Sequence, residues 1–139
     1  MELELNGSQA LLRQSLRSLL DRELDFGRVR EVERSGGFDE RLWRALAEHG
    51  WLGLPFPEED GGAAGEVLDA AIVLEELSRR AAIVPYAETL AAGLTLARHG
   101  SRGARTLLPG LVAGYSVVVP AVLDELDSFE QLGASGPAN

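Results

Sequence analysis

Apolar residues recur every three or four positions along most of this chain, and glycine- or proline-containing stretches separate the segments that show this spacing. Side chains three and four positions apart lie on one face of an α-helix, so this spacing predicts amphipathic helices. The longer segments are residues 8–24, 39–49, 66–80 and 85–100, and a shorter one, weakened by Gly103 and Pro109, covers residues 101–108. Acidic and basic residues alternate over residues 26–33, where only a turn or two of helix is expected. The fold class predicted is all-α, an up-and-down helical bundle of about five to six helices.

The residues that flank these segments are types that begin and end helices. Ser8, Asp39 and Ser101 can each accept a hydrogen bond from a free backbone N–H of a first turn. Gly50 can adopt the left-handed conformation that closes a helix. The pattern therefore fixes the expected helix ends as well as the helices.

Two regions break the helical pattern. Prolines and glycines exclude a single helix over residues 51–65, but Trp51 and Phe56 are apolar enough to be buried, so we expect an ordered loop packed by its own side chains. The β-branched residues 117–119 predict one short C-terminal strand, and no apolar stripe follows it. We therefore expect a helical domain over residues 1–114, and over residues 115–139 a strand followed by a loose tail.

Composition excludes several classes of function. The 139 residues suffice for one core, and 22 acidic against 13 basic residues give a net charge of −9, which disfavours nucleic acid as a partner. The chain has no cysteine, which excludes thiolate chemistry and fits a reducing compartment, so a cytoplasmic location is expected. No apolar run approaches the ~20 residues that span a bilayer, so no membrane association is expected.

Acidic and glycine-rich motifs are weak candidates for chemistry. The acidic residues 58–60 lack the spacing of a calcium loop, which favours a solvated turn. Glu75 and Glu76 diverge on a helix, so they cannot share a proton and are expected to be surface or interface charges. The glycine-rich residues 61–65 resemble a phosphate cradle, but no basic residue follows until Arg79.

The two histidines, His49 and His99, each precede a glycine that closes a predicted helix. At that position an imidazole can contact the last carbonyl groups and favours the helix dipole, so capping is expected rather than catalysis. No nucleophile motif and no metal-spaced histidines occur. The sequence therefore predicts no catalytic residue and no metal site.

Several motifs nevertheless occur in an order that resembles a known family. They are LWRALAEHGWLGL at residues 42–54, PEEDGG at 57–62, VLEEL at 73–77, PY at 85–86, HGS at 99–101 and LLPGLVAG at 107–114. Together they resemble the amino-terminal helical domain of the acyl-CoA dehydrogenase family over residues 11–122. The all-helical bundle of that domain agrees with the helices that periodicity predicts.

The resemblance implies that the chain takes part in flavin chemistry but does not itself carry the reacting groups. Members of the family abstract a proton beside a thioester carbonyl and pass a hydride to FAD, and they use this domain, a β-domain and a second helical domain. The catalytic glutamate and most cofactor contacts lie in the parts that this chain lacks. By resemblance, the helix at 85–99 shapes the far end of the acyl pocket. The candidate wall residues are Ile83, Val84, Ala87, Leu90, Ala91 and Leu94, for which plain core packing is the alternative.

One departure from the family concerns the cofactor. Where the family commonly reads aromatic-Ala-Leu-Thr-Glu-Pro, with a threonine that touches the flavin, residues 120–125 read PAVLDE. Leu123 stands at the threonine position and has no hydroxyl to donate. The resemblance thus implies FAD in the assembled enzyme, but no cofactor bound by this chain alone.

Two hypotheses of function follow. The chain is either the N-terminal domain or a non-catalytic subunit of a flavin-dependent acyl-CoA dehydrogenase, or a freestanding helical module for interaction or dimerisation that has lost the chemistry. The first requires the missing β- and C-terminal domains or a dehydrogenase-like partner chain, whereas the second is compatible with a homo-oligomer.

Overall fold

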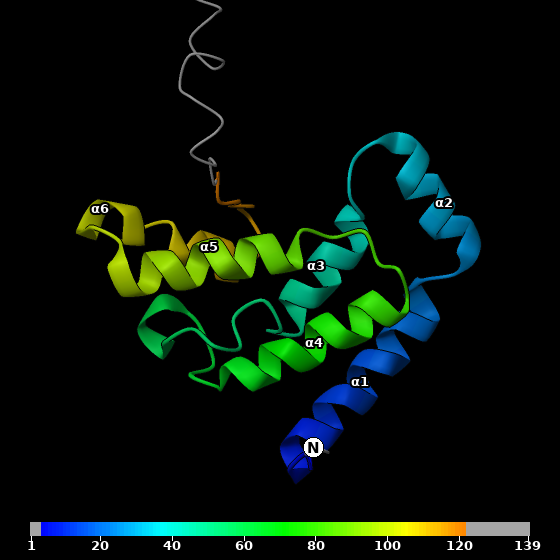
Figure 1. The fold of residues 1–139 in the computed structure, drawn as a ribbon, viewed down its shortest axis with the longest axis horizontal. Coiled ribbons are helices and arrows are strands. Elements are labelled where there is room, and N and C mark those ends of the chain that lie inside the picture. The colour runs from blue at the N-terminus through cyan, green and yellow to red at the C-terminus, as the bar shows by residue number, and fades with distance from the viewer. Residues whose placement is uncertain (1–3, 122–139) are drawn as a thin grey trace, which may run out of the picture.

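The computed structural model describes residues 4–121, and this part of the chain is helical (Figure 1). Its elements in order are α1 (Gly7–Glu23), α2 (Phe26–Ser35), α3 (Glu40–Glu48), the 3-10 helix η1 (Glu58–Asp60), α4 (Val67–Arg79), α5 (Tyr86–His99), α6 (Arg102–Arg105) and α7 (Leu108–Val112). The predicted all-α class is confirmed. None of the helices in the described part is both long enough and apolar enough to cross a membrane.

Most of the predicted helix ends agree with the structure. The Asp39 side chain accepts a hydrogen bond from the backbone N–H of Leu42, and Ser101 caps α6 through its hydroxyl. Gly50 has the expected positive φ of 73°. These ends were predictable because each depends on the conformation or hydrogen bonding of a single residue close to the helix.

The helix begins at Gly7, close to the predicted start, but the capping role predicted for Ser8 is wrong. Asn6 is the N-cap: its side chain accepts from the backbone N–H of Gln9, and the Gln9 side chain accepts from the backbone N–H of Asn6. This reciprocal capping box satisfies two free donors, whereas Ser8 donates its own hydroxyl to Asn6 Oδ1.

The region after Ser101 also differs from its prediction. Instead of one helix, α6 ends after Arg105 and α7 begins at Leu108, because Pro109 has no N–H and fits only in the first turn of a new helix. The strand predicted at residues 117–119 is not formed, since the described residues contain no other strand with which it could pair. The high β propensity of residues 117–119 is therefore not sufficient to form a strand.

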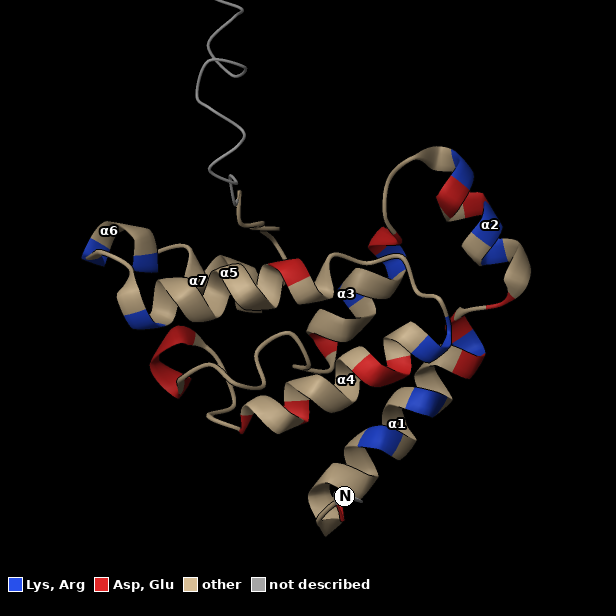
Figure 2. Cartoon of the chain, in the orientation of Figure 1, with Lys and Arg blue, Asp and Glu red and all other residues tan. Residues whose placement is uncertain are grey.

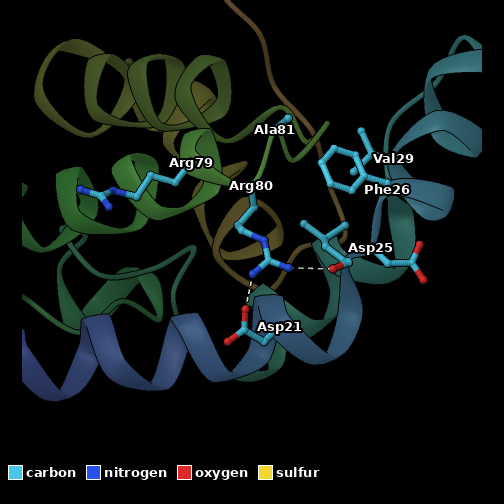
Figure 3. Close-up of a pocket in the computed structure, with 8 residues that line it drawn as sticks. Asp21, Asp25, Phe26, Val29, Arg79, Arg80 and Ala81 are labelled. Atoms are coloured by element: carbon cyan, nitrogen blue, oxygen red, sulfur yellow. Dashed lines mark hydrogen bonds and ion pairs between the residues drawn. The ribbon is translucent and has the colours of Figure 1, made fainter.

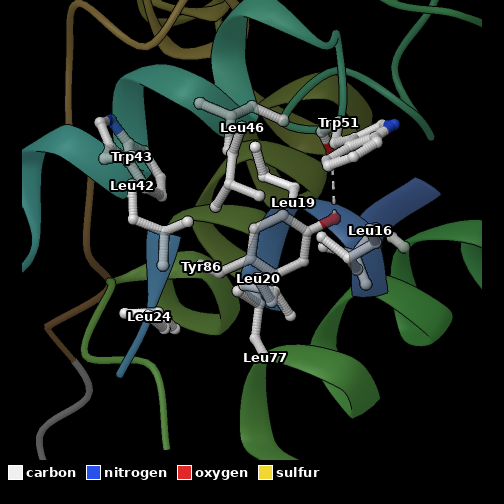
Figure 4. Packing of buried hydrophobic residues seen from close by; sticks show 13 residues of the cluster. Leu16, Leu19, Leu20, Leu24, Leu42, Trp43, Leu46, Trp51, Leu77 and Tyr86 are labelled. Atoms are coloured by element: carbon white, nitrogen blue, oxygen red, sulfur yellow. Dashed lines mark hydrogen bonds between the residues drawn. The ribbon is translucent and has the colours of Figure 1, made fainter. Parts of the chain in front are cut away.

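The core consists of two clusters. The larger lies between α1, α3, α4 and the start of α5 (Figure 4); its members include Leu16, Leu19, Leu20, Leu42, Leu46, Trp51, Leu77 and Tyr86. The smaller consists of Phe56, Leu108, Leu111 and Val112, with Leu94 and Ala97 packed against it. Trp51 lies in the first cluster and Phe56 in the second, so the loop over residues 51–65 is ordered by its own buried side chains, as predicted.

Helices α1 and α4 lie side by side and run in the same direction. Gln9 Nε2 donates to Asp69 Oδ1 near the start of both helices, and Arg80, just beyond the end of α4, pairs with Asp21 near the end of α1. Between these ends, basic residues of α1 lie along acidic residues of α4 (Figure 2), and Arg13 pairs with Glu75 and Arg17 with Glu76. The order of these contacts makes the pair parallel although the two helices are distant in sequence.

Glu76 is the exception to the expectation of surface charges on α4. It is 2% exposed, and its carboxylate accepts from Arg17 Nε and Nη2, each at 2.9 Å. Hydrogen bonds and charge from Arg17 hold the pKa of Glu76 below its ordinary value against the opposing effect of burial. Glu75 remains on the surface, as expected, and pairs with Arg13 and Arg79.

Candidate functional site

Helix α5 carries the predicted pocket wall, and its inner face is closely packed. The buried residues of that face are Tyr86, Thr89, Ala92 and Gly93. A Cβ atom added at Gly93 would lie 2.6 Å from Phe56 Cζ and 3.1 Å from Leu111 Cδ1. Only glycine therefore allows α5 to lie this close to the loop and to α7. This contact, together with the hydrogen bond of 3.1 Å from the Tyr86 hydroxyl to the Trp51 carbonyl oxygen, fixes the helix on one side.

The six candidate wall residues divide into two groups by burial. Leu90 and Leu94 are half-buried and pack against the smaller cluster, and Val84 packs against the larger one, so core packing accounts for part of each. Ala87 and Ala91 are exposed, and their spacing of four places them on one face of α5. Ile83 is half-buried, and its carbonyl oxygen accepts from Asp39 N at 2.7 Å. Ala87 and Ala91 are thus the two candidates that the rest of the described chain leaves exposed.

A partly buried ion pair lies at the start of α3, far from Ala87 and Ala91 in sequence. Asp39 is 1% exposed and accepts from Arg28 Nε at 3.0 Å and from Arg28 Nη2 at 2.8 Å. Burial by itself raises the pKa of Asp39, but the hydrogen bonds from Arg28 and Leu42 N and the charge of Arg28 outweigh it, so the pKa lies below its ordinary value. Since the same carboxylate caps α3, the pair joins α2 to α3 and has a structural explanation.

The other motifs considered for chemistry also have structural explanations. His49 is the C-cap of α3, with Nδ1 2.7 Å from the Ala45 carbonyl oxygen, and its ring packs against Trp51. A Cβ atom at Gly62 would lie 2.2 Å from the Phe56 carbonyl oxygen, so the glycine-rich loop is needed for close backbone packing. His99 is the last residue of α5. Within residues 4–121, no group of three or more potential ligands is arranged to hold a metal ion.

Surface hollows were not foreseen from the sequence, and two of them stand out by their volume. The larger, of about 560 Å³, lies at the corner between α1, α2 and the end of α4 (Figure 3). The other, of about 410 Å³, lies between α3 and the residues that follow α7. One feature of the sequence could have indicated the larger hollow. Phe26, which borders it, is a large apolar residue directly after the helix cap Asp25.

These hollows do not fit the flavin implied by the resemblance. A dinucleotide needs free N–H donors or cations for its pyrophosphate, but Arg80 already pairs with Asp21 and with the Leu24 carbonyl oxygen. In the second hollow Arg44 pairs with Glu40. Neither hollow therefore offers a free cation for a flavin pyrophosphate, and Leu123 lies outside the described residues.

Comparison with known proteins gives consistent matches. The family model described as "Acyl-CoA dehydrogenase, N-terminal domain" matches residues 6–115. The chain is 38% identical over 115 residues to acyl-CoA dehydrogenase IpdE2 of Mycobacterium tuberculosis, a match covering 79% of this chain and 36% of that protein. It is 40% identical over 92 residues to IpdE2 of Mycolicibacterium smegmatis, covering 65% of this chain and 30% of that protein. The chain thus spans about a third of the length of these curated relatives.

Solved structures show the same relationship in three dimensions. A variant of the Tcur3481-Tcur3483 steroid ACAD superposes with a TM-score of 0.77 and 37% identity, over 81% of this chain and 31% of that chain. An electron transferring flavoprotein structure of Acidaminococcus fermentans superposes with a TM-score of 0.66 at 24% identity, over 84% of this chain and 32% of that chain, and supports the fold alone.

Proposed function

The chain belongs to the acyl-CoA dehydrogenase family, and from this premise we propose that it serves as the N-terminal domain or a non-catalytic subunit of a flavin-dependent enzyme that oxidises an acyl thioester. The match over residues 6–115 and the helical fold support this role. The rest of the enzyme, about two-thirds of the length of the relatives, comes from further domains or from a partner chain.

In this proposal the outer side of α5 is a wall of the acyl pocket. The observation that carries it is the pair of exposed small residues, Ala87 and Ala91, on a helix whose opposite face is fixed by the contact of Gly93 with Phe56. Small apolar side chains leave room for a ligand and present it with no competing polar group. The half-buried Ile83, Val84, Leu90 and Leu94 form the apolar base of that wall.

FAD supplies the acceptor for the hydride in the assembled enzyme, and we place its binding residues and the catalytic base outside this chain. The described residues position and shield the acyl group. Their contribution is steric, because Ala87 and Ala91 carry no group that can donate or accept a proton.

We propose an acyl thioester with a bulky, polycyclic acyl group as the first substrate to test. The reason is the similarity to a steroid ACAD at 37% identity over 81% of this chain. Alanine at two of the exposed positions of α5, Ala87 and Ala91, is consistent with a wide pocket.

The test is co-expression of this chain with acyl-CoA dehydrogenase-like chains that carry the β- and C-terminal domains, followed by turnover assays on the purified complex. We expect co-purification and acyl-thioester oxidation. In Ala91→Phe the larger side chain should raise KM for a steroid acyl thioester by about tenfold, corresponding to about 1.4 kcal/mol of binding, and change KM for a short acyl thioester less.

Ala10→Phe is the matched control, because Ala10 is also an exposed alanine on a helix but lies on α1. It should behave like the unsubstituted chain. If no candidate chain binds, the freestanding module remains as the alternative; if Ala91→Phe and Ala10→Phe give the same substrate profile in a working complex, α5 is not part of the pocket.

A further inference from the structure

Helix α2 lies at the edge of the described chain and is held there by few contacts (Figure 1). Of its ten residues, all except Arg28, Val29 and Val32 are exposed. Val32 is 5% exposed, and the half-buried Val29 packs against the larger core cluster. Because the stabilisation from apolar burial is proportional to the area removed from water, two valines hold α2 only weakly.

The ion pair between Arg28 and Asp39 is the main polar attachment of α2. Arg28 Nε and Nη2 donate to the two oxygens of the Asp39 carboxylate, at 3.0 Å and 2.8 Å. In the part of the chain that the structure describes, no other ion pair or side-chain hydrogen bond links α2 to another helix or to the cap of one. Since a buried carboxylate that loses its cation is costly, this pair opposes any movement of α2 away from the fold.

The segments that flank α2 are short and suited to act as hinges. Gly36, directly after α2, has a φ of 70°, and a Cβ atom at this position would meet nothing within 4 Å. On the other side, Leu24 and Asp25 have extended backbone and separate α2 from α1. Leu24 is 4% exposed and Asp39 is 1% exposed, so both flanks are anchored in the fold. The helix between them can therefore leave its place by changes in a few backbone angles.

We propose that α2 is a flap that opens while α1, α3, α4 and α5 stay folded, and that the pair between Arg28 and Asp39 is its latch. A detached helix of ten residues is too short to be stable in water, so α2 unravels when it opens. The backbone N–H of Asp39 donates to the Ile83 carbonyl oxygen at 2.7 Å, so the latch residue also holds the segment that leads into α5. The flap is a property of the chain by itself and does not depend on the proposed function.

The test is native-state hydrogen exchange of the purified chain, followed residue by residue by NMR. The hydrogen-bonded amides of α2 should be protected at least about tenfold less than those of α1 and α4, because they exchange by local opening. Arg28→Lys keeps the charge but loses the two-pronged contact, so it should speed exchange in α2 and at the Asp39 amide about tenfold and leave α1 and α4 unchanged. Val32→Ala weakens the apolar attachment instead and should give the same pattern.

Arg17→Lys is the matched control. Arg17 also donates two hydrogen bonds, each of 2.9 Å, to a buried carboxylate, that of Glu76, but this pair joins α1 to α4. The substitution should speed exchange in α1 and α4 and have no selective effect on α2. Amides of α2 that are protected as strongly as those of α1 and α4 would overturn the proposal, because α2 then opens only when the whole chain unfolds. The same exchange pattern in Arg28→Lys and Arg17→Lys would overturn the assignment of the latch.

Discussion

Replacing Gly93 by alanine tests the close packing that fixes α5. The new Cβ atom would lie 2.6 Å from Phe56 Cζ, where ordinary contacts begin at 3.4 Å. Phe56 is 0% exposed and Leu111 is 1% exposed, so neither side chain can move into solvent to relieve the overlap. The substitution should therefore strain the smaller core cluster and push α5 away from the loop.

Two opposing effects set the size of the change. Overpacking a core typically costs about 1–3 kcal/mol, whereas alanine in place of glycine inside a helix gains up to about 1 kcal/mol. Because the overlap involves two fully buried side chains, we expect the strain to dominate, with a net loss of about 1–2 kcal/mol. For a chain of this size that corresponds to a fall in Tm of roughly 3–7 °C.

Thermal and urea unfolding followed by circular dichroism measure this change. Gly103→Ala is the control, because nothing lies within 4 Å of a Cβ atom at that position, and it should leave stability unchanged or raise it. Adding Phe56→Leu to Gly93→Ala should cost less than the sum of the two single changes, since the shorter side chain relieves the overlap. If Gly93→Ala instead raises Tm as an unobstructed helical position would, the close contact with Phe56 is refuted.

Two further predictions concern buried polar contacts. Asp39→Asn keeps an acceptor for Leu42 N but removes the charge that pairs with Arg28. Because the folded-state pKa of Asp39 is lowered, the pair stabilises the fold above the unfolded-state pKa of about 3.9 and loses this effect as the pH falls through the folded-state value. The gap in urea midpoint between wild type and Asp39→Asn should thus be full at about pH 6 and smaller at about pH 3; a constant gap argues against the ion pair. Tyr86→Phe removes the hydrogen bond to Trp51 and leaves its carbonyl unpaired, so unfolding free energy should fall by about 1 kcal/mol in the same assay, and an unchanged value would show that the bond contributes nothing.

The helices were predictable from sequence because their signals are local. Apolar spacing located α1, α3, α4 and α5 to within a few residues, and single residues such as Asp39 and Gly50 marked their ends. The helix α2 is longer, at ten residues, than the turn or two expected from its alternating charges. The cap of α1 was assigned to the wrong residue because Asn6 and Ser8 can both cap a helix, and only the reciprocal partner Gln9 decides between them.

The features that depend on distant residues were not predictable in the same way. Glu76 was expected on the surface because its neighbours on α4 do not reveal Arg17, which lies 59 positions away in sequence. The valines at residues 117–119 were expected to form a strand because their β propensity is local, while a pairing partner is not. The hollow beside Phe26 arises where three helices meet, and no single segment contains it.

The candidate site was predictable only as a list of residues. The resemblance supplied the six positions around α5, and the structure separates exposed Ala87 and Ala91 from the partly packed Val84, Leu90 and Leu94. Burial makes this distinction because periodicity assigns a residue to a helix face but does not say what covers that face.

The central claim is that this helical domain contributes structure and has no chemistry of its own. Purifying the chain alone and measuring its visible flavin absorbance and its acyl-thioester-dependent dye reduction tests this claim most directly. We predict no bound flavin and no turnover by the chain alone, and turnover when the chain is assembled with a partner that carries the remaining domains. Stoichiometric flavin together with acyl-thioester oxidation by the isolated chain would contradict this assignment.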